Sequence, residues 1–257
     1  MDNTIDLKLR LFGGRPIHAK GYGEITPLTV REIMDFGYTE YLKCLNILTL
    51  GVKDILTNLG IEVDESEYET LNVLELLISL GGEEVDKLLE KALSLFLGGE
   101  AIIDKDNRRV FIKKNEKDFA VIDKYNYGEI QEVLKWQNYI NNFEEKKISE
   151  KFNPADEETR RLKEQMDALA KKRDALKAKQ KQNSAEEEEG SIDFYDILSA
   201  IASKSYGINE INIQDLTVYQ VYSKFKRLEI IDQYDISVQS IMAGAKDIKI
   251  KHWSSKI

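Results

Sequence analysis

An abrupt change of composition divides the chain into three parts. From about residue 144 to residue 189 the sequence alternates Lys and Arg with Asp and Glu among alanines, and it has almost no aromatic residues. This composition favours a solvated helix that buries no core, whereas both flanks carry periodic apolar residues. The sequence therefore predicts an N-terminal domain over residues 1–145, a charged helical linker over 146–190 and a small C-terminal domain over 191–257.

The linker carries a short seam of apolar residues at heptad spacing. Four residues stand at core positions: Leu162, Met166, Leu169 and Leu176. Arg173 and Gln180 fill the intervening core positions, so the seam is short and interrupted. A weak coiled-coil pair and a lone solvated helix both fit this pattern, and the lone helix fits it better. The sequence leaves open whether the chain forms a homo-oligomer.

The start of the chain shows the period of a β-strand. Residues 5–12 alternate apolar and polar side chains, and a short extended run around Ile17 follows Gly13 and Gly14. An alternation of period two is typical of a strand with one buried face. We therefore expect a two-stranded ribbon at the N-terminus.

Three capping boxes predict helix starts. In this motif a Ser or Thr accepts a hydrogen bond from the third helical residue, whose Glu or Gln side chain accepts one in return. The pairs are Thr29 with Glu32, Ser66 with Glu69, and Thr217 with Gln220. The first opens a helix whose apolar stripe reaches Leu48, and the second opens an almost entirely apolar helix that ends at Gly81. This second helix is expected to be the central core helix.

The other elements follow from apolar periodicity. We expect helices over 85–96 and 130–143, strands at 101–103, 110–112 and 119–122, and C-terminal helices over 194–201, 218–228 and 234–242. The predicted fold class is mostly α, of the α+β type, with β-hairpins in the N-terminal domain. The C-terminal domain is expected to consist of three helices.

The acidic balance of the chain limits its partners. The formal net charge is -9, so binding of DNA or RNA by counterion release has no general electrostatic support. Residues 1–6 carry acids where a secretion signal needs a basic start, and no segment approaches the roughly 18 apolar residues of a membrane helix. We therefore expect a cytoplasmic protein that binds neither nucleic acid nor a membrane.

Motifs for catalysis and for cofactors are missing. The two histidines, His18 and His252, lie at opposite ends of the sequence, which excludes a site with several histidine ligands. The single cysteine, Cys44, lies in an apolar helical stripe, where a small buried side chain is expected. The Gly21-Tyr22-Gly23 stretch lacks the third glycine of a dinucleotide-binding turn. We expect a protein without enzymatic activity, cofactor or metal site.

Large amphipathic side chains are the candidates for partner binding. They are Trp136, Tyr219, Lys226 and Trp253. Aromatic residues with a polar atom are enriched in protein interfaces. Trp253 fits equally well as a clamp that holds the chain end on the small C-terminal core.

Two stretches resemble a known family. The first is Ile25-Thr26-Pro27-Leu28-Thr29-Val30-Arg31-Glu32-Ile33, followed by Tyr38, Tyr41 and Leu48-Thr49. The second is Asp215-Leu216-Thr217-Val218-Tyr219-Gln220-Val221-Tyr222, followed by Lys224-Phe225 and Ala243-Gly244-Ala245-Lys246-Asp247. Both are similar to tail assembly proteins of phages and prophages of Gram-positive bacteria. The resemblance implies an N-terminal helical domain that binds the tape measure protein and a C-terminal extension that recruits tail tube subunits.

The expected function is therefore that of a phage tail assembly chaperone. Such a protein coats the tape measure protein in the cytoplasm and does not enter the mature virion. A structural morphogenesis protein that stays in the particle, such as a scaffold or tail completion protein, is one alternative. A nucleic-acid-binding or enzymatic factor without a recognisable motif is the other.

Overall fold

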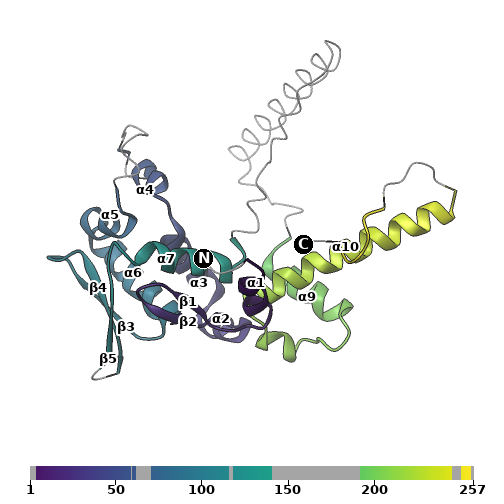
Figure 1. Ribbon diagram of the computed structural model, residues 1–257, viewed down its shortest axis with the longest axis horizontal. Coiled ribbons are helices and arrows are strands. Elements are labelled where there is room, and N and C mark those ends of the chain that lie inside the picture. Colours follow the sequence, from purple (N-terminus) through teal and green to yellow (C-terminus); the bar gives the residue numbers. More distant parts are fainter. Residues whose placement is uncertain are drawn as a thin grey trace, which may run out of the picture. The chain divides into compact units, whose positions relative to one another are not determined.

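The structure is a computed structural model, and it describes residues 4–58, 60–61, 71–115, 118–140, 192–244 and 250–255 (Figure 1). These residues are mostly α-helical and include two small antiparallel sheets, so the predicted fold class is confirmed. Contacts between residues divide the chain into Met1–Phe143 with Ile197–Ile257, and Glu144–Asp196. The predicted domain boundaries and the heptad seam of the linker lie outside the described residues.

The bounds of the elements follow in chain order. The N-terminal ones are α1 (Thr4–Phe12), β1 (Ile17–Ala19), β2 (Gly23–Ile25), α2 (Val30–Phe36), α3 (Tyr38–Thr49), α4 (Val52–Asn58), α5 (Val73–Leu80), α6 (Gly82–Leu97), β3 (Glu100–Asp104), β4 (Arg109–Asn115), β5 (Asp118–Ile122) and α7 (Tyr127–Gln137). The C-terminal ones are α9 (Phe194–Lys204), the 3-10 helix η3 (Asn212–Asp215) and α10 (Val218–Met242).

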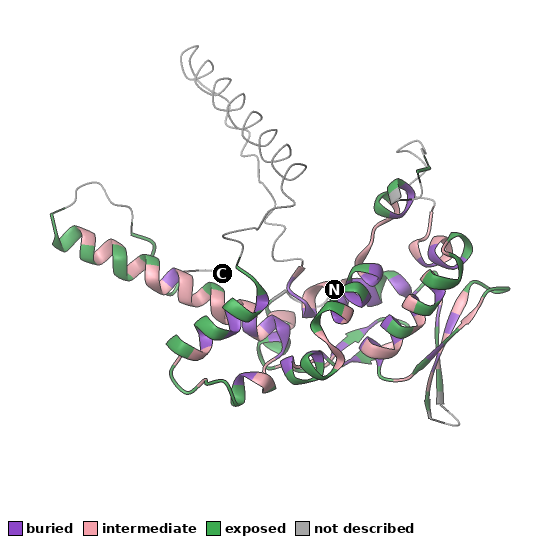
Figure 2. Cartoon of the chain, turned by 180° about the vertical axis from the view of Figure 1, so that it is seen from behind, coloured by how far each residue is buried: buried purple, intermediate pink, exposed green. Residues whose placement is uncertain are grey.

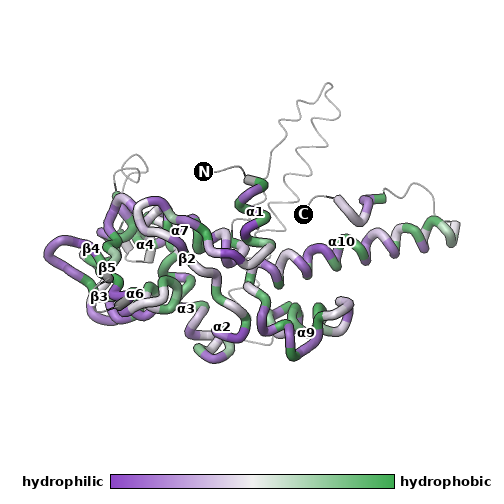
Figure 3. Tube along the Cα trace, turned by 60° about the horizontal axis from the view of Figure 1, so that its bottom comes forward, coloured by the Kyte–Doolittle hydropathy of each residue, from purple (hydrophilic) through white to green (hydrophobic). Residues whose placement is uncertain are grey.

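The first element is a helix, so the prediction of a strand over residues 5–12 is wrong. Leu7 and Leu11 are four positions apart and lie on the inner side of α1, where Leu11 is buried. Ile5 and Leu9 lie on the opposite side and are exposed. An alternation that looks like a strand therefore gives a helix with two apolar faces, and Figure 3 shows apolar and polar residues following each other along α1.

A two-stranded ribbon does form, but it begins later in the sequence. β1 pairs with β2 in antiparallel register, with Ile17 opposite Ile25. Both of these side chains are buried and belong to the core. The ribbon thus lies between α1 and α2, and its first strand contacts both α1 and α7.

The capping box of Thr29 and Glu32 begins α2 as predicted. The Thr29 hydroxyl accepts from the Glu32 amide at 3.3 Å, and the Glu32 carboxylate accepts from the Thr29 amide at 2.7 Å. The prediction of a single helix that reaches Leu48 is wrong, because Gly37 divides this segment into two helices. Gly37 has φ 98°, a backbone angle that no helix contains, and it separates α2 from α3.

The central helices α5 and α6 follow each other closely. Asn72 caps α5 by accepting from the amides of Leu74 and Glu75. The prediction of one helix from Ser66 to Gly81 is therefore wrong, because α5 begins at Val73, and the predicted box at Ser66 itself lies outside the described residues. α6 ends at Gly98 in the left-handed conformation, φ 67°, as the glycine pair predicts. One side of α6 packs against α3 and another against the second sheet.

The second sheet has the strand order β3-β4-β5 and is antiparallel throughout. The predicted hairpin and the third strand are therefore confirmed. Ala101, Val110, Ile112 and Ile122 face the core, and Ile102, Phe119 and Val121 are exposed on the other side. The sheet thus has one buried and one solvated face, as the alternation of its residues requires.

Helix α7 joins the ribbon to the helical layer through buried amide side chains. The Gln137 amide nitrogen donates to the Ile25 carbonyl at 2.8 Å, and that of Gln131 donates to the Leu48 carbonyl at 2.8 Å. Both side chains are buried, so these hydrogen bonds offset the cost of removing the amides from water. They fix α7 against β2 and against the end of α3.

The C-terminal part contains one long helix where two were predicted. α10 runs from Val218 to Met242 without interruption, because the residues between 228 and 234 include neither glycine nor proline. The capping box of Thr217 and Gln220 is confirmed, and Gly244 follows the end of the helix with φ 93°. None of the described helices has the length and apolarity needed to cross a membrane.

Candidate functional site

The two sequence motifs that resemble the phage family contact each other. Leu28-Thr29-Val30 and Leu216-Thr217-Val218 each precede a helix, and Thr29 pairs with Thr217 in an isolated antiparallel bridge. The Val30 amide donates to the Leu216 carbonyl at 2.8 Å. We call this contact the threonine clasp.

Polar side chains flank the threonine clasp on both sides. The Arg31 guanidinium donates to the Asp215 carboxylate at 2.8 Å, and this exposed ion pair raises the pKa of Arg31. The Gln220 amide nitrogen donates to the Phe12 carbonyl, which lies at the end of α1, at 2.9 Å. The start of α10 is thereby tied to both α1 and α2.

A group of tyrosines extends the contact between the N-terminal and C-terminal parts. The Tyr139 ring lies 5.4 Å from the Tyr219 ring and 5.6 Å from the Tyr222 ring, measured between centroids. Burial raises the pKa of all three phenols. Tyr41 adds a hydrogen bond of 2.6 Å from its hydroxyl to the Asn138 side-chain oxygen. The phenol hydroxyls are protonated at neutral pH, and the tyrosine rings contribute packing between the two parts of the chain.

The four predicted partner-binding residues do not converge on one site. Tyr219 is buried within the tyrosine group, and Lys226 is exposed beside Glu229 at 3.3 Å. Trp253 is 49% exposed, and its carbonyl accepts from Arg227 at 2.7 Å. Trp136 lies on α7 and lines a cavity.

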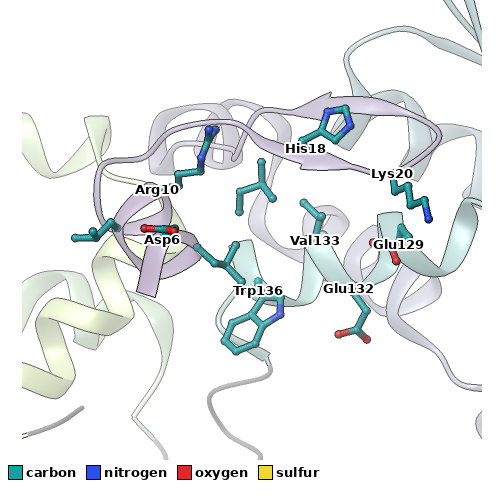
Figure 4. Close-up of a pocket in the computed structure, with 11 residues that line it drawn as sticks. Asp6, Arg10, His18, Lys20, Glu129, Glu132, Val133 and Trp136 are labelled. Atoms are coloured by element: carbon teal, nitrogen blue, oxygen red, sulfur yellow. The ribbon is translucent and has the colours of Figure 1, made fainter. Parts of the chain in front are cut away.

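This cavity lies between α1, β1 and α7 and has a volume of about 740 Å³ (Figure 4). Leu7, Leu9, Ile17, Val133 and Trp136 supply its apolar lining. Charged and polar side chains surround them: Asp6, Arg10, His18, Lys20, Glu129 and Glu132. In Figure 4 Arg10 and His18 border one side of the cavity, whereas Glu129 and Glu132 lie on the α7 side.

The indole nitrogen of Trp136 is buried and has no hydrogen-bond partner among the described residues. A buried donor without an acceptor costs free energy. The volume of the cavity falls within the range of roughly 300–1,000 Å³ that is typical of ligand sites.

An exposed apolar surface adjoins the cavity. Ile5, Leu9 and Phe12 are 64%, 61% and 70% exposed, and their spacing of four and three residues places them on one side of α1. We call this surface the outward face of α1. Sequence reasoning missed both features, because a strand over residues 5–12 hides the helical spacing and because the cavity is built from distant segments.

The described residues contain no group of three or more His, Cys, Asp or Glu side chains that could hold a metal ion. His18 lies at the cavity, whereas His252 packs against Tyr234 with ring centroids 5.6 Å apart. Cys44 is fully buried, and burial raises the pKa of its thiol. A thiol with a raised pKa is a poor nucleophile at neutral pH.

The C-terminal part of the chain is similar to a known domain. Residues 179–257 match the YomV second domain. The match is to a phage-associated domain and covers less than half of the chain. Its described part contains α9, η3 and α10, and therefore the C-terminal half of the threonine clasp. No curated protein and no solved structure matches the chain.

Proposed function

We propose that this chain is a phage tail assembly chaperone that binds the tape measure protein and recruits tail tube subunits. The observation that carries the proposal is the outward face of α1 beside the cavity. The phage-associated domain in residues 179–257 and the resemblance of the two threonine motifs support it. The proposal assigns no catalysis, cofactor or metal to the chain.

The outward face of α1 has the chemistry that an apolar helical partner needs. Amphipathic helices bind to hydrophobic grooves through side chains spaced three or four residues apart. Ile5, Leu9 and Phe12 offer such a surface, and the cavity next to Leu9 can accept a side chain of the partner. Large exposed apolar patches on soluble proteins mark interaction sites.

A binding measurement with a tape measure fragment tests the proposal. The whole chain is the proper reagent, because the Val30 amide and the Phe12 carbonyl find their partners in the C-terminal part. We expect the wild-type chain to retain the fragment and Leu9→Glu to weaken binding by at least about tenfold, since a carboxylate on an apolar contact is costly.

Ile211→Glu is the matched control for this measurement. Ile211 is 79% exposed, against 61% for Leu9, but it lies just before η3 and not on α1. Binding by this variant should equal that of the wild type. A folded wild-type chain that does not retain the fragment, or a Leu9→Glu variant that binds as tightly, would contradict the proposal.

Recruitment of tail tube subunits is assigned to the C-terminal part. Lys226 and Trp253 stay the candidate contacts, and both are exposed there. Trp253→Ala is expected to reduce capture of tube subunits while tape measure binding stays unchanged. If Trp253→Ala reduced the binding of tube subunits and of the tape measure protein equally, this result would argue against separate surfaces for the two partners.

A chaperone is released before the particle is complete. Mass spectrometry of purified virions should therefore detect the tape measure and tube proteins but not this chain. Its presence at a fixed copy number in the virion would instead identify a structural morphogenesis protein.

A further inference from the structure

The outward face of α1 lies in a basic stretch of an acidic chain. Between residues 5 and 20 the bases are Lys8, Arg10, Arg15 and Lys20, against the single acid Asp6, which gives four minus one, or a net charge of +3. The whole chain has a net charge of -9. No described residue forms an ion pair with any of these four bases, although Glu129 and Glu132 line the same cavity as Arg10 and Lys20.

The far end of α10 carries an acid instead. From Glu229 to Met242 the helix contains Glu229, Asp232 and Asp235 and no base. Glu229 and Asp232 form ion pairs with Lys226 and Lys204, so Asp235 is the acid of this segment that has no ion pair among the described residues. Ile241 and Met242 lie three and four residues after Val238, so these three residues share one side of the helix. We call these three residues the distal face of α10.

The distal face of α10 is open to solvent. Met242 is 82% exposed and Ile241 is 40% exposed, and Figure 2 shows α10 changing from buried to exposed residues along its length. The described C-terminal residues contact the middle of the helix, where Arg227 donates to the Trp253 carbonyl and Tyr234 packs against His252. The distal face therefore has apolar side chains with no partner in the described part of the chain.

The two faces cannot meet within one molecule. Gln220, in the first turn of α10, is hydrogen-bonded to the end of α1. Met242 lies 22 residues further along the same uninterrupted helix, which at 1.5 Å per residue is about 33 Å away. A straight helix cannot fold its far end back onto α1.

We propose that the distal face of α10 in one copy of the chain binds to the outward face of α1 in a second copy. Asp235 of α10 then lies near the bases of the α1 stretch, and both apolar faces leave water together. Two chains of net charge -9 repel each other at long range, so their association needs a local contact of opposite charges such as this one. The contact joins two different surfaces and is therefore heterologous.

This contact covers the surface that the proposed function assigns to the tape measure protein. Self-association would then compete with partner binding and keep the apolar face of α1 out of water until a partner is present. The inference concerns copies of this chain alone. It can hold even if the tape measure protein is not the partner.

Sedimentation of the pure chain tests the proposal. The wild type is expected to self-associate as its concentration rises, and less so at high salt, because the charges at the contact are screened. Leu9→Asp and Met242→Asp should each weaken the association by at least about tenfold, since each places an unpaired carboxylate in the contact. Ile211→Asp, on an unrelated exposed surface, should behave like the wild type.

A mixture of the two variants gives the decisive result. Leu9→Asp keeps a functional distal face of α10, and Met242→Asp keeps a functional outward face of α1. Each variant alone should stay monomeric, whereas an equimolar mixture should form a one-to-one complex. A monomeric wild type at all concentrations, an association that neither substitution affects, or a mixture that stays monomeric would each overturn the proposal.

Discussion

Thr29 and Thr217 each cap a helix, and the same two residues pair with each other in an antiparallel bridge. The two uses are compatible because a capping residue has an extended backbone, with φ -86° at Thr29 and -81° at Thr217. The side chain starts the helix while the backbone joins the partner segment. One short motif, present twice, thus sets both the local helix starts and the contact between the two ends of the chain.

Thr217→Ala should lower the free energy of unfolding by about 1 kcal/mol, because the Gln220 amide loses its capping acceptor. Ser237→Ala, on the same helix, is the control. Its hydroxyl bonds to the Gln233 carbonyl and caps nothing, so a change within about 0.5 kcal/mol is expected. Urea denaturation followed by circular dichroism measures both. Equal effects of the two substitutions would count against a specific role of the cap.

Gly37→Ala should destabilise the protein by about 1–3 kcal/mol, because an L-residue at φ 98° is strained. The space around Gly37 is open, so the cost is one of backbone conformation and not of a clash. Gly128→Ala, within α7 and equally open, should instead be neutral or stabilising by up to about 1 kcal/mol. In thermal unfolding, the melting temperatures of the two variants should shift in opposite directions, or only that of Gly37→Ala should shift.

The Cys44 thiol should react with a thiol reagent only when the protein unfolds. Cys44 is fully buried on α3, and burial raises the pKa of its thiol, so both access and thiolate formation are suppressed. The labelling rate in buffer should be at least about 100-fold below the rate in denaturant. Rapid labelling of the native chain would show that α3 opens locally.

Acid should weaken the contact between α3 and α6 through Glu40. Its carboxylate accepts from Lys43 at 2.8 Å and from Lys91 at 2.6 Å, and these hydrogen bonds lower the pKa of Glu40 to about 2. Because the folded pKa lies below the ordinary value of 4.5, this contribution is present above pH 4.5 and is lost as the pH falls toward 2.

Glu40→Gln is the matched variant for the acid prediction. It should be less stable than the wild type at pH 6, and the difference should shrink as the pH falls to 2, where about half of the wild-type carboxyls are neutral, and vanish below that pH. The measurement is the free energy of unfolding of both chains across this range. A difference that stays constant with pH would show that the charge of Glu40 has no part in it.

The elements that the sequence predicts correctly are those set by local interactions. The capping boxes at Thr29 and Thr217 involve residues three positions apart, and Gly98 ends α6 through its own backbone angle. The strands of the second sheet follow from alternation between core and solvent over a few residues. Each of these signals lies within one turn or one hairpin, so tertiary context does not reverse it.

The features that the sequence does not predict depend on long-range packing. Ile5, Leu7, Leu9 and Leu11 satisfy the spacing of a strand, and only the packing of Leu7 and Leu11 against the core and the contact of α1 with α10 show that they belong to a helix. Both His18 and Trp136 line the cavity, although 118 positions separate them, as 136 minus 18 gives. No window of local sequence contains that information.

The threonine clasp also bears on how the chain is made. The acceptor of the Val30 amide is the Leu216 carbonyl, which is synthesised 186 residues later, as 216 minus 30 gives. At roughly 5–20 residues per second, about 10–40 s pass on the ribosome before that acceptor exists. Throughout this interval α2 has been translated but its Val30 amide lacks this partner. The N-terminal part of a newly made chain is therefore exposed to the cell before its own C-terminal part has been synthesised.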